Sequence, residues 1–326
     1  MVFRRADGGS AVDDSRGTVV LAEPRGFCAG VRRAIAVVER ALERHGAPVY
    51  VRKEIVHNAH VVSVLRRRGA VFVDSEAEVP EGAVCVFSAH GVSPAVRAAA
   101  AERSLAVVDA TCPLVAKVHQ EARRYARDGR TVLLLGHADH EEVEGTVGEA
   151  PDRTIVVDSV AAAEAVRLPK GARPAYLTQT TLAVDETAGM VEVLERRFPD
   201  LVGPGSGDIC YASQNRQDAV KAVAAETGLV LVVGSPNSSN SVRMVEVAEL
   251  AGTPARLLPD VSHLDPAWLA GVTSVGLSAG ASAPEVLVDE VLDRLAELGY
   301  PDVRLASVAV EDVVFALPSS VGGGTA

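Results

Sequence analysis

The sequence predicts an α/β protein made of three pseudo-symmetric small αβ domains, whose mostly parallel sheets surround a central site. Three observations lead to this prediction. Short apolar runs alternate with amphipathic helical patterns along the 326 residues, as expected for parallel sheets covered by helices. This pattern occurs three times, and each copy contains a cysteine in the same setting. Polar loops follow each cysteine at matching distances.

The three cysteines Cys28, Cys112 and Cys210 lie where an extended run changes into a helical pattern. The sequences TVVLAEPRGFC, LAVVDATC and GPGSGDIC lead into them. In the third copy we expect Ser213 to be the helix N-cap. Each helical pattern stops at a glycine, namely Gly46, Gly129 and Gly228.

A buried strand and a polar loop follow each of these helices. The first polar loops carry one residue each at 29, 28 and 28 residues after the cysteine, namely His57, His140 and Ser238. A further strand in each copy leads to a second polar loop, with His90, Thr180 and Ser282. Strand-end loops of parallel sheets meet at one edge, so we expect all these loops to face one central cavity.

The repeat sets the expected domain boundaries. We expect a first domain at 18–110, a second at 111–208 and a third at 209–318, where the run VVFALP forms a closing strand. Residues 1–17 and 319–326 are rich in small and polar residues and are expected to be disordered tails.

Composition narrows the classes of function. The formal net charge of −11 disfavours nucleic acid and acidic membrane surfaces as partners. No apolar stretch has the length of a membrane span, and the N-terminus lacks the apolar block of a signal peptide. We therefore expect a cytoplasmic protein whose four cysteines are reduced thiols.

The thiols separate into one structural residue and three candidate ligands. Cys85 lies in the strand-like run AVCVF and is expected to be a core residue. Cys28, Cys112 and Cys210 are 84 and 98 residues apart, whereas zinc sites commonly use close cysteine pairs. A four-iron cluster held by three thiolates keeps one iron without a protein ligand, which favours chemistry over electron carriage. Zinc and an iron–sulfur cluster both stay open at this point.

The remaining polar residues suit an anion and a proton transfer. Side-chain donors without a lysine cluster, together with helix N-termini, fit a phosphate or diphosphate. The chain has no P-loop and no GxGxxG after a strand, so ATP and NAD are not expected. Glu142 is the carboxylate expected to deliver a proton to a leaving hydroxyl, while Glu141 and Glu144 are close by. The candidate donors are His57, His90, His140, Thr180, Ser238, Ser239, Asn240 and Ser282.

Nine stretches in the same order resemble a known family. They are PRGFCAGVRRAI, YVRKEIVHN, FSAHGVS, DATCPLVAKVH, GHADHEEVEGT, TQTTL, DICYASQNRQ, GSPNSSNS and SAGASAPE. Together they span about residues 18–318. The sequence is similar to the IspH/LytB family, the 4-hydroxy-3-methylbut-2-enyl diphosphate reductases.

The resemblance implies a site and a reaction. Cys28, Cys112 and Cys210 match the ligands of a 4Fe-4S cluster with three cysteine ligands and one open iron. His140, Thr180 and Glu142 match positions near the substrate hydroxyl, with Glu142 in the proton relay. The positions that match diphosphate contacts are His57, His90, Ser238, Ser239, Asn240 and Ser282.

The implied reaction is a reductive dehydroxylation that gives isopentenyl and dimethylallyl diphosphate, the last step of the methylerythritol phosphate route to isoprenoids. The resemblance also implies ferredoxin or flavodoxin as electron donor, and ultimately NADPH. Three other hypotheses stay open: an iron–sulfur hydro-lyase, a non-enzymatic redox or iron sensor, and a zinc enzyme with three thiolates. In one position the sequence departs from the family, because Glu141 replaces a common proline. We expect this replacement to loosen the loop before Glu142.

Overall fold

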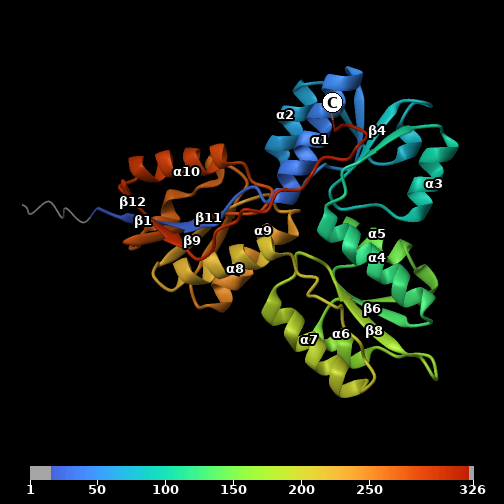
Figure 1. The fold of residues 1–326 in the computed structure, drawn as a ribbon. Coiled ribbons are helices and arrows are strands. Elements are labelled where there is room, and N and C mark those ends of the chain that lie inside the picture. The colour runs from blue at the N-terminus through green and yellow to red at the C-terminus, as the bar shows by residue number, and fades with distance from the viewer. Residues whose placement is uncertain (1–15, 323–326) are drawn as a thin grey trace, which may run out of the picture.

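The computed structural model describes residues 16–322, which form three groups of helices and strands (Figure 1). Each group contains one sheet, and every strand pair in it is parallel, which confirms the predicted α/β class. Most of the predicted tails, at 1–15 and 323–326, lies outside the described residues. Across the described part of the chain, no helix combines the length and apolar character needed to cross a bilayer.

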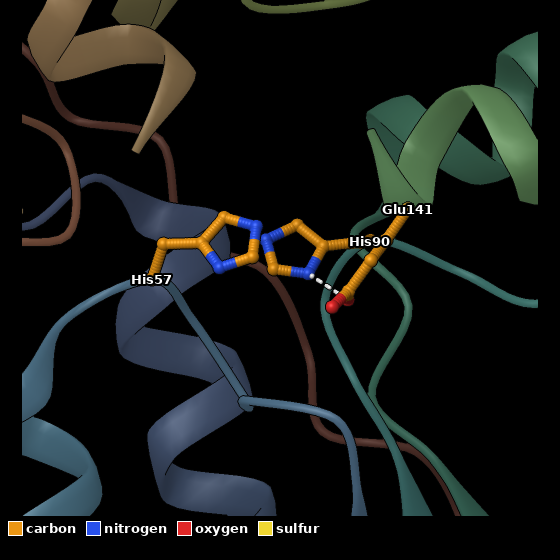
Figure 2. Close-up of side chains that lie close together, drawn as sticks. All are labelled: His57, His90 and Glu141. Carbon is orange, nitrogen blue, oxygen red and sulfur yellow. Dashed lines mark hydrogen bonds and ion pairs between the residues drawn. The ribbon is translucent and has the colours of Figure 1, made fainter. Parts of the chain in front are cut away.

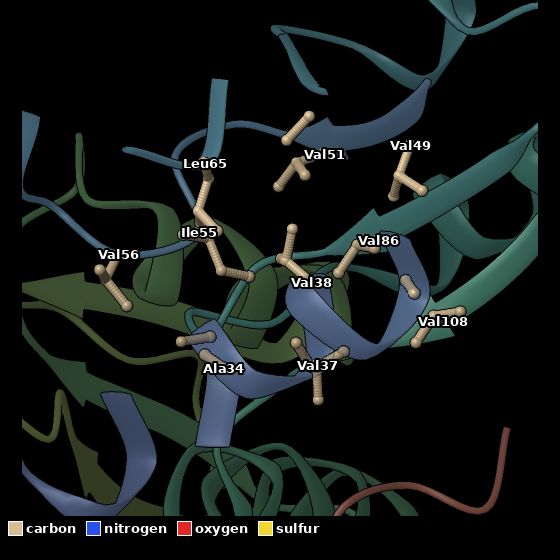
Figure 3. Close-up of a cluster of buried hydrophobic side chains, with 14 of the residues drawn as sticks. Ala34, Val37, Val38, Val49, Val51, Ile55, Val56, Leu65, Val86 and Val108 are labelled. Atoms are coloured by element: carbon tan, nitrogen blue, oxygen red, sulfur yellow. The ribbon is translucent and has the colours of Figure 1, made fainter. Parts of the chain in front are cut away.

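The first sheet has the strand order β3-β2-β4-β5. Its strands are β2 (Val49–Arg52), β3 (Ala70–Val73), β4 (Val84–Phe87) and β5 (Ala106–Asp109). Its helices are α1 (Ala29–His45), α2 (Ala59–Arg67) and α3 (Pro94–Glu102), with a short 3-10 turn η1 (Glu76–Glu78). Figure 3 shows Val37 and Val38 of α1 in one cluster with Val51 and Val86 of the sheet. This apolar stripe of α1, repeated every three or four residues, is what attaches the helix to the sheet.

The second sheet has the strand order β7-β6-β8. Its strands are β6 (Thr131–Leu135), β7 (Thr154–Val157) and β8 (Pro174–Thr178). Its helices are α4 (Pro113–Arg127), α5 (Glu141–Gly148), α6 (Val160–Ala165) and α7 (Val184–Arg197), with a 3-10 turn η2 (Pro151–Arg153). Apolar clusters on both faces bury β6, in agreement with its unbroken run TVLLL.

The third sheet has five strands in the order β10-β9-β11-β1-β12. Its strands are β1 (Thr18–Glu23), β9 (Leu229–Val233), β10 (Ala255–Leu258), β11 (Ser274–Ala279) and β12 (Asp302–Ser307). Its helices are α8 (Tyr211–Ala224), α9 (Ser239–Leu250) and α10 (Glu285–Glu297), with 3-10 turns η3 (Val261–His263) and η4 (Pro266–Leu269).

The three sheets share one topology, because the orders β3-β2-β4, β7-β6-β8 and β10-β9-β11 are equivalent. The extended run before each cysteine pairs with the last strand of such a trio. β1 pairs with β11, β5 pairs with β4, and Val202 forms a bridge to Ala175 of β8. Each cysteine therefore lies where the chain leaves one sheet for the next. The prediction that placed β1 in the first domain at 18–110 was wrong, because β1 completes the third sheet and closes this cycle.

The C-terminal segment also differs from the prediction. The run VVFALP (313–318) is not a strand; the strand that closes the third sheet is β12, which pairs with β1. The chain then crosses to the first unit, where Leu317 and Val321 pack on the core of α1. Val321 is only 4% exposed, so the described part of the expected tail, 319–322, is docked. Burial of apolar side chains on an existing core holds this segment without sheet hydrogen bonds.

Candidate functional site

All twelve predicted site residues line one cavity between the three units. The cavity lies beyond the carboxyl ends of the strands, where ligands of open α/β sheets bind. The twelve are Cys28, Cys112, Cys210, His57, His90, His140, Glu142, Thr180, Ser238, Ser239, Asn240 and Ser282. Residues that are far apart in the sequence thus share one space.

Each of the three cysteines is the N-cap residue of a long helix. Cys28 precedes α1, Cys112 precedes α4 and Cys210 precedes α8. Helix N-termini carry partial positive charge, which favours a thiolate. The prediction that Ser213 is the N-cap of the third helix was wrong, because the helix starts two residues earlier and Ser213 lies in its first turn.

One backbone hydrogen bond recurs at all three cysteines. The N–H of each cysteine donates to the carbonyl of a loop residue that follows the last strand of a trio. The acceptors are Ala281 for Cys28 at 3.2 Å, Ala89 for Cys112 at 2.9 Å and Thr180 for Cys210 at 2.9 Å. The cysteine loops and the polar loops are therefore held to one another by the backbone, independently of any ligand.

The spacing of the thiols is too wide for one zinc ion. Among residues 16–322, the one group of three ligating side chains with all ligand atoms within 4.8 Å is His57, His90 and Glu141, and the three thiols do not form such a group. Sulfur ligands of a tetrahedral zinc ion lie about 3.8 Å apart, given a Zn–S distance of about 2.3 Å. The thiols thus suit a larger group.

Gly30 keeps the space beside the thiols open. A Cβ at this position would lie 2.8 Å from Cys112 Sγ and 3.8 Å from Cys28 Sγ. Burial raises the pKa of Cys112 to about 11 and that of Cys210 to about 12. Thiolates here need a positive charge from a bound metal group. The thiol donor set and its spacing thus fit an iron–sulfur cluster.

Glu142 is buried and 2% exposed. The Thr180 N–H donates to its Oε1 at 2.7 Å, and the Thr180 hydroxyl donates to its Oε2 at 2.9 Å. Burial raises the pKa of Glu142 to about 7, and the hydrogen bonds from Thr180 limit this rise. A carboxyl with this pKa exchanges its proton near neutral pH, as a general acid requires.

His140 is the N-cap of α5, and its Nδ1 accepts the N–H of Glu142 at 3.2 Å. Burial, together with the nearby His90 and His57, lowers the pKa of His140 to about 3. His140 is therefore neutral and carries its proton on Nε2.

His57 and His90 stack on each other, with ring centroids 4.1 Å apart and an interplanar angle of 15°. Figure 2 shows the two imidazoles side by side, with a dashed line from His90 Nδ1 to the carboxylate of Glu141. His90 Nδ1 lies 3.0 Å from Glu141 Oε2, and His57 Nδ1 lies 3.1 Å from Glu54 Oε2. Glu141 is the first residue of α5, and its carboxylate joins the start of this helix to His90.

The serine and asparagine residues lie at the start of α9 and after β11. Asn240 Oδ1 accepts the N–H of Ala281 at 2.8 Å, while its buried Nδ2 has no hydrogen-bond partner. Ser282 donates to the His57 carbonyl at 2.9 Å, and Ser239 accepts from Thr181 at 3.0 Å. A buried donor without a partner on the wall of a cavity indicates a ligand acceptor.

Sequence reasoning missed four side chains that support the site: Glu54, Thr181, Arg216 and Glu311. Arg216 is 0% exposed, and its Nε donates to the carbonyl of Gly26 at 3.0 Å. Its Nη1 donates to the Ala212 carbonyl at 2.8 Å and to Glu311 at 2.9 Å. Glu54 stands three residues before His57, and that spacing is the one local signal the sequence offered.

Comparison with known proteins identifies relatives along nearly the whole chain. The family model described as LytB protein matches residues 19–296. A protein of Nocardia farcinica (strain IFM 10152) named 4-hydroxy-3-methylbut-2-enyl diphosphate reductase is 61% identical, covering 96% of this chain and 94% of its own length. A protein of the same name from Mycolicibacterium paratuberculosis is also 61% identical, over 95% of this chain and 94% of its own.

Two solved structures are also similar. The E-1-hydroxy-2-methyl-but-2-enyl-4-diphosphate reductase from Plasmodium falciparum aligns with a TM-score of 0.91 at 37% identity, covering 94% of this chain and 97% of its own. A second structure, of (E)-4-hydroxy-3-methyl-but-2-enyl diphosphate reductase, aligns with a TM-score of 0.61 at 30% identity, covering 86% of this chain and 99% of its own. Its title calls that protein the terminal enzyme of the non-mevalonate pathway.

Proposed function

The chain belongs to the LytB protein family and reduces 4-hydroxy-3-methylbut-2-enyl diphosphate, the terminal reaction of the non-mevalonate pathway to isoprenoids, and we propose that the cavity between its three units is the active site. The family implies an iron–sulfur cofactor. The convergence of three helix-capping cysteines on a cavity lined with histidine, serine, threonine and asparagine side chains is the observation that carries this proposal.

Cys28, Cys112 and Cys210 would hold a 4Fe-4S cluster through their three thiolates, with one iron left open. When bound, this cluster supplies electrons and a Lewis-acidic iron. The protein itself contributes the fixed positions of the three thiols. The backbone bonds to Ala89, Thr180 and Ala281 fix the three thiols relative to the substrate-binding loops.

The diphosphate lies against the histidines and the start of α9. His57, His90 and Ser282 come from the loops after the strands, and Ser238, Ser239 and Asn240 from the N-terminal end of α9. The unpaired Nδ2 of Asn240 donates to a phosphate oxygen, and the N-terminal end of α9 adds a favourable dipole. With the diphosphate held there, the hydroxyl end of the short substrate reaches the part of the cavity that contains the thiols.

Glu142 protonates the departing hydroxyl, which leaves as water. Thr180 holds the carboxyl in place with two hydrogen bonds, and the neutral His140 donates from Nε2 into the same part of the cavity. Two electrons and two protons balance the reaction, because one proton leaves with the oxygen and one binds carbon. Addition of the second proton at either end of the allyl unit gives isopentenyl or dimethylallyl diphosphate.

The electrons come one at a time from a ferredoxin or flavodoxin, ultimately from NADPH, in the cytoplasm. The test is an anaerobic assay of the holoenzyme with iron and sulfide analysis. We expect four irons per chain and formation of both products only when a reductant is present. Turnover without reductant would indicate a hydro-lyase, binding without turnover a sensor, and zinc without sulfide a zinc enzyme.

A further inference from the structure

The stacked histidines each use Nδ1 to contact a carboxylate. His57 Nδ1 lies 3.1 Å from Glu54, and His90 Nδ1 lies 3.0 Å from Glu141. The hydrogen bond from His57 lowers the pKa of Glu54. Burial raises the pKa of Glu141, but the hydrogen bond and charge of His90, together with the charges of His57 and Lys53, outweigh burial and lower it. Both groups are therefore carboxylates, which can only accept, so Nδ1 carries the proton in both rings.

This tautomer has a consequence for anion binding. A neutral imidazole with its proton on Nδ1 presents a lone pair at Nε2, and a lone pair repels a phosphate oxygen. Only the imidazolium form of His57 or His90 donates to a carboxylate and a phosphate at once. His140 differs, because its Nδ1 accepts the Glu142 N–H and its Nε2 donates in the neutral form.

Without a bound anion, protonation of both His57 and His90 is unfavourable, because the two stacked imidazolium rings repel each other. Burial, followed by the charge of His57, lowers the pKa of His90, and the contact with Glu141 opposes this effect. Besides the three cavity thiols, charged or titratable side chains of the described residues surround the pair on three elements. Lys53 and Glu54 come from the loop after β2, Arg243 comes from α9, and the segment that leads into and begins α5 carries His137, Asp139, His140, Glu141 and Glu142. A diphosphate would supply the negative charge that a doubly protonated pair needs.

A single metal ion is a poorer occupant for this cluster. His57, His90 and Glu141 have ligand atoms within 4.8 Å of one another. The rings, however, are nearly parallel and stacked, so their in-plane lone pairs lie in two different planes. One ion cannot lie in the plane of both rings, whereas separate oxygens of a diphosphate can each meet one ring.

We infer that diphosphate binding is coupled to proton uptake by His57 and His90, with Glu54 and Glu141 as positioning residues that fix the tautomer of each ring. This inference rests on the proposed function of the cavity. Each neutral ring takes one proton from solvent at Nε2 and becomes an imidazolium between its carboxylate and a phosphate oxygen. No other bond is made or broken.

The experiment is calorimetric titration of the oxidised holoenzyme with the substrate in the absence of reductant, and separately with inorganic diphosphate. Titrations at pH 8 in two buffers with different ionisation enthalpies count the protons taken up. The terminal phosphate of the substrate has its last pKa at about 6, so at pH 8 the substrate is ionised and the proton uptake on its binding belongs to the protein. Inorganic diphosphate still holds part of its last proton at this pH, so it reports affinity and is not used to count protons. We expect uptake of about one to two protons per site.

Glu141→Gln is the decisive variant, because glutamine keeps the size of the side chain and removes its charge. We expect it to lower the uptake by about one proton and to raise the Kd about tenfold. In Glu141→Gln, the KM for the substrate should begin to rise at a lower pH than in the unaltered protein, because the imidazolium of His90 loses its carboxylate. The kcat should stay unchanged. Glu144→Gln, an exposed glutamate on the same helix, is the matched control and should match the unaltered protein.

Equal heats in both buffers for the unaltered protein, or undiminished uptake in Glu141→Gln, would overturn the inference. If Glu141→Gln does not fold, Glu54→Gln probes the second ring in the same way, and undiminished uptake there would also overturn it. Failure of the proposed function looks different. In that case inorganic diphosphate would still bind, and Glu141→Gln would still weaken its binding, but the reduced holoenzyme would not convert the substrate.

Discussion

The carboxylate of Glu142 accepts two hydrogen bonds from Thr180, one from the backbone N–H at 2.7 Å and one from the hydroxyl at 2.9 Å. The same Thr180 accepts the N–H of Cys210 through its carbonyl oxygen. One residue therefore holds the carboxyl of Glu142 at a fixed position relative to Cys210. In the proposed function, this relationship would bring the acid and the cluster to the same end of the substrate.

Replacement of Glu142 by glutamine should abolish the proton transfer and keep the site. We expect Glu142→Gln to lower kcat by roughly 100- to 10,000-fold, the usual contribution of general acid catalysis. Iron content and the Kd of the substrate should stay near those of the unaltered protein. The measurement is anaerobic turnover with iron analysis on the same samples, with Glu144→Gln as control. Normal turnover of Glu142→Gln would remove this residue from the mechanism.

The pH dependence of the reaction should report the pKa of Glu142, which is about 7. The acid must be protonated, so kcat/KM should fall as pH rises through this value. The Thr180 hydroxyl lowers the pKa of Glu142, so Thr180→Val should raise it and move the alkaline limb to higher pH. Between pH 4.5 and about 7 the folded protein binds the extra proton, so this residue's contribution to stability falls as pH rises. A limb that moves to lower pH in Thr180→Val would contradict the assignment.

The three loop cysteines should be needed for the cofactor, and the strand cysteine should not. Serine at Cys28, Cys112 or Cys210 should each remove most iron and sulfide from anaerobic preparations. Cys85 is buried inside β4, away from the cavity, and Cys85→Ala should keep the full cofactor content. The measurement is iron and sulfide content with the visible absorbance spectrum. Full iron content in all three serine variants would contradict the ligand set.

The unpaired donor of Asn240 makes a sharp prediction for binding. Asn240→Asp keeps an oxygen to accept the N–H of Ala281, but it places a second acceptor where Nδ2 lies. We expect KM for the substrate to rise about 10- to 100-fold, because one hydrogen bond to a charged group is lost and a repulsion is added. The thermal midpoint should change little. An unchanged KM would show that the diphosphate does not contact Asn240.

Arg216 should stabilise the fold and the cysteine loops together. Its guanidinium contacts Gly26 before Cys28, Ala212 after Cys210, and Glu311 of the C-terminal segment. Removal of one partner of a buried charge pair costs about 3 to 5 kcal/mol. We expect Arg216→Ala to lower the free energy of unfolding by about this amount and to reduce iron retention. Arg40→Ala, which breaks an exposed ion pair, should cost less than about 1 kcal/mol by denaturant titration, and an equal loss in both variants would contradict this role.

The threefold pattern was visible in the sequence because it consists of local signals. Helix α1 follows Cys28 and ends at Gly46, as its apolar spacing and the glycine stop predict. The polar loops of the three copies correspond to one another because they lie at equal distances along the chain from their cysteines. Such distances can be counted in the sequence without knowing any contact in space. Cys85 was recognised as a core residue for the same reason, since an apolar run on both sides indicates a strand interior.

The errors concern contacts between distant parts of the chain. β1 precedes Cys28 in sequence but pairs with β11 and β12, so no local pattern could place it in the third sheet. The run VVFALP has the apolar character of a strand, yet its segment docks on the core of α1. An apolar run predicts that its side chains are buried, but it does not specify which strand or helix they pack against.

By itself, the sequence determined the α/β class, the repeated strand and helix order, and twelve of the residues that line the cavity, because periodicity and loop position are properties of neighbouring residues. Only the tertiary structure decided which sheet each strand joins, which ring nitrogen of His57 and His90 is engaged, and that Glu54, Glu141 and Arg216 support the site. Hydrogen bonds and burial between residues that are far apart in sequence depend on distance in space, and the order of residues along a chain does not contain that distance.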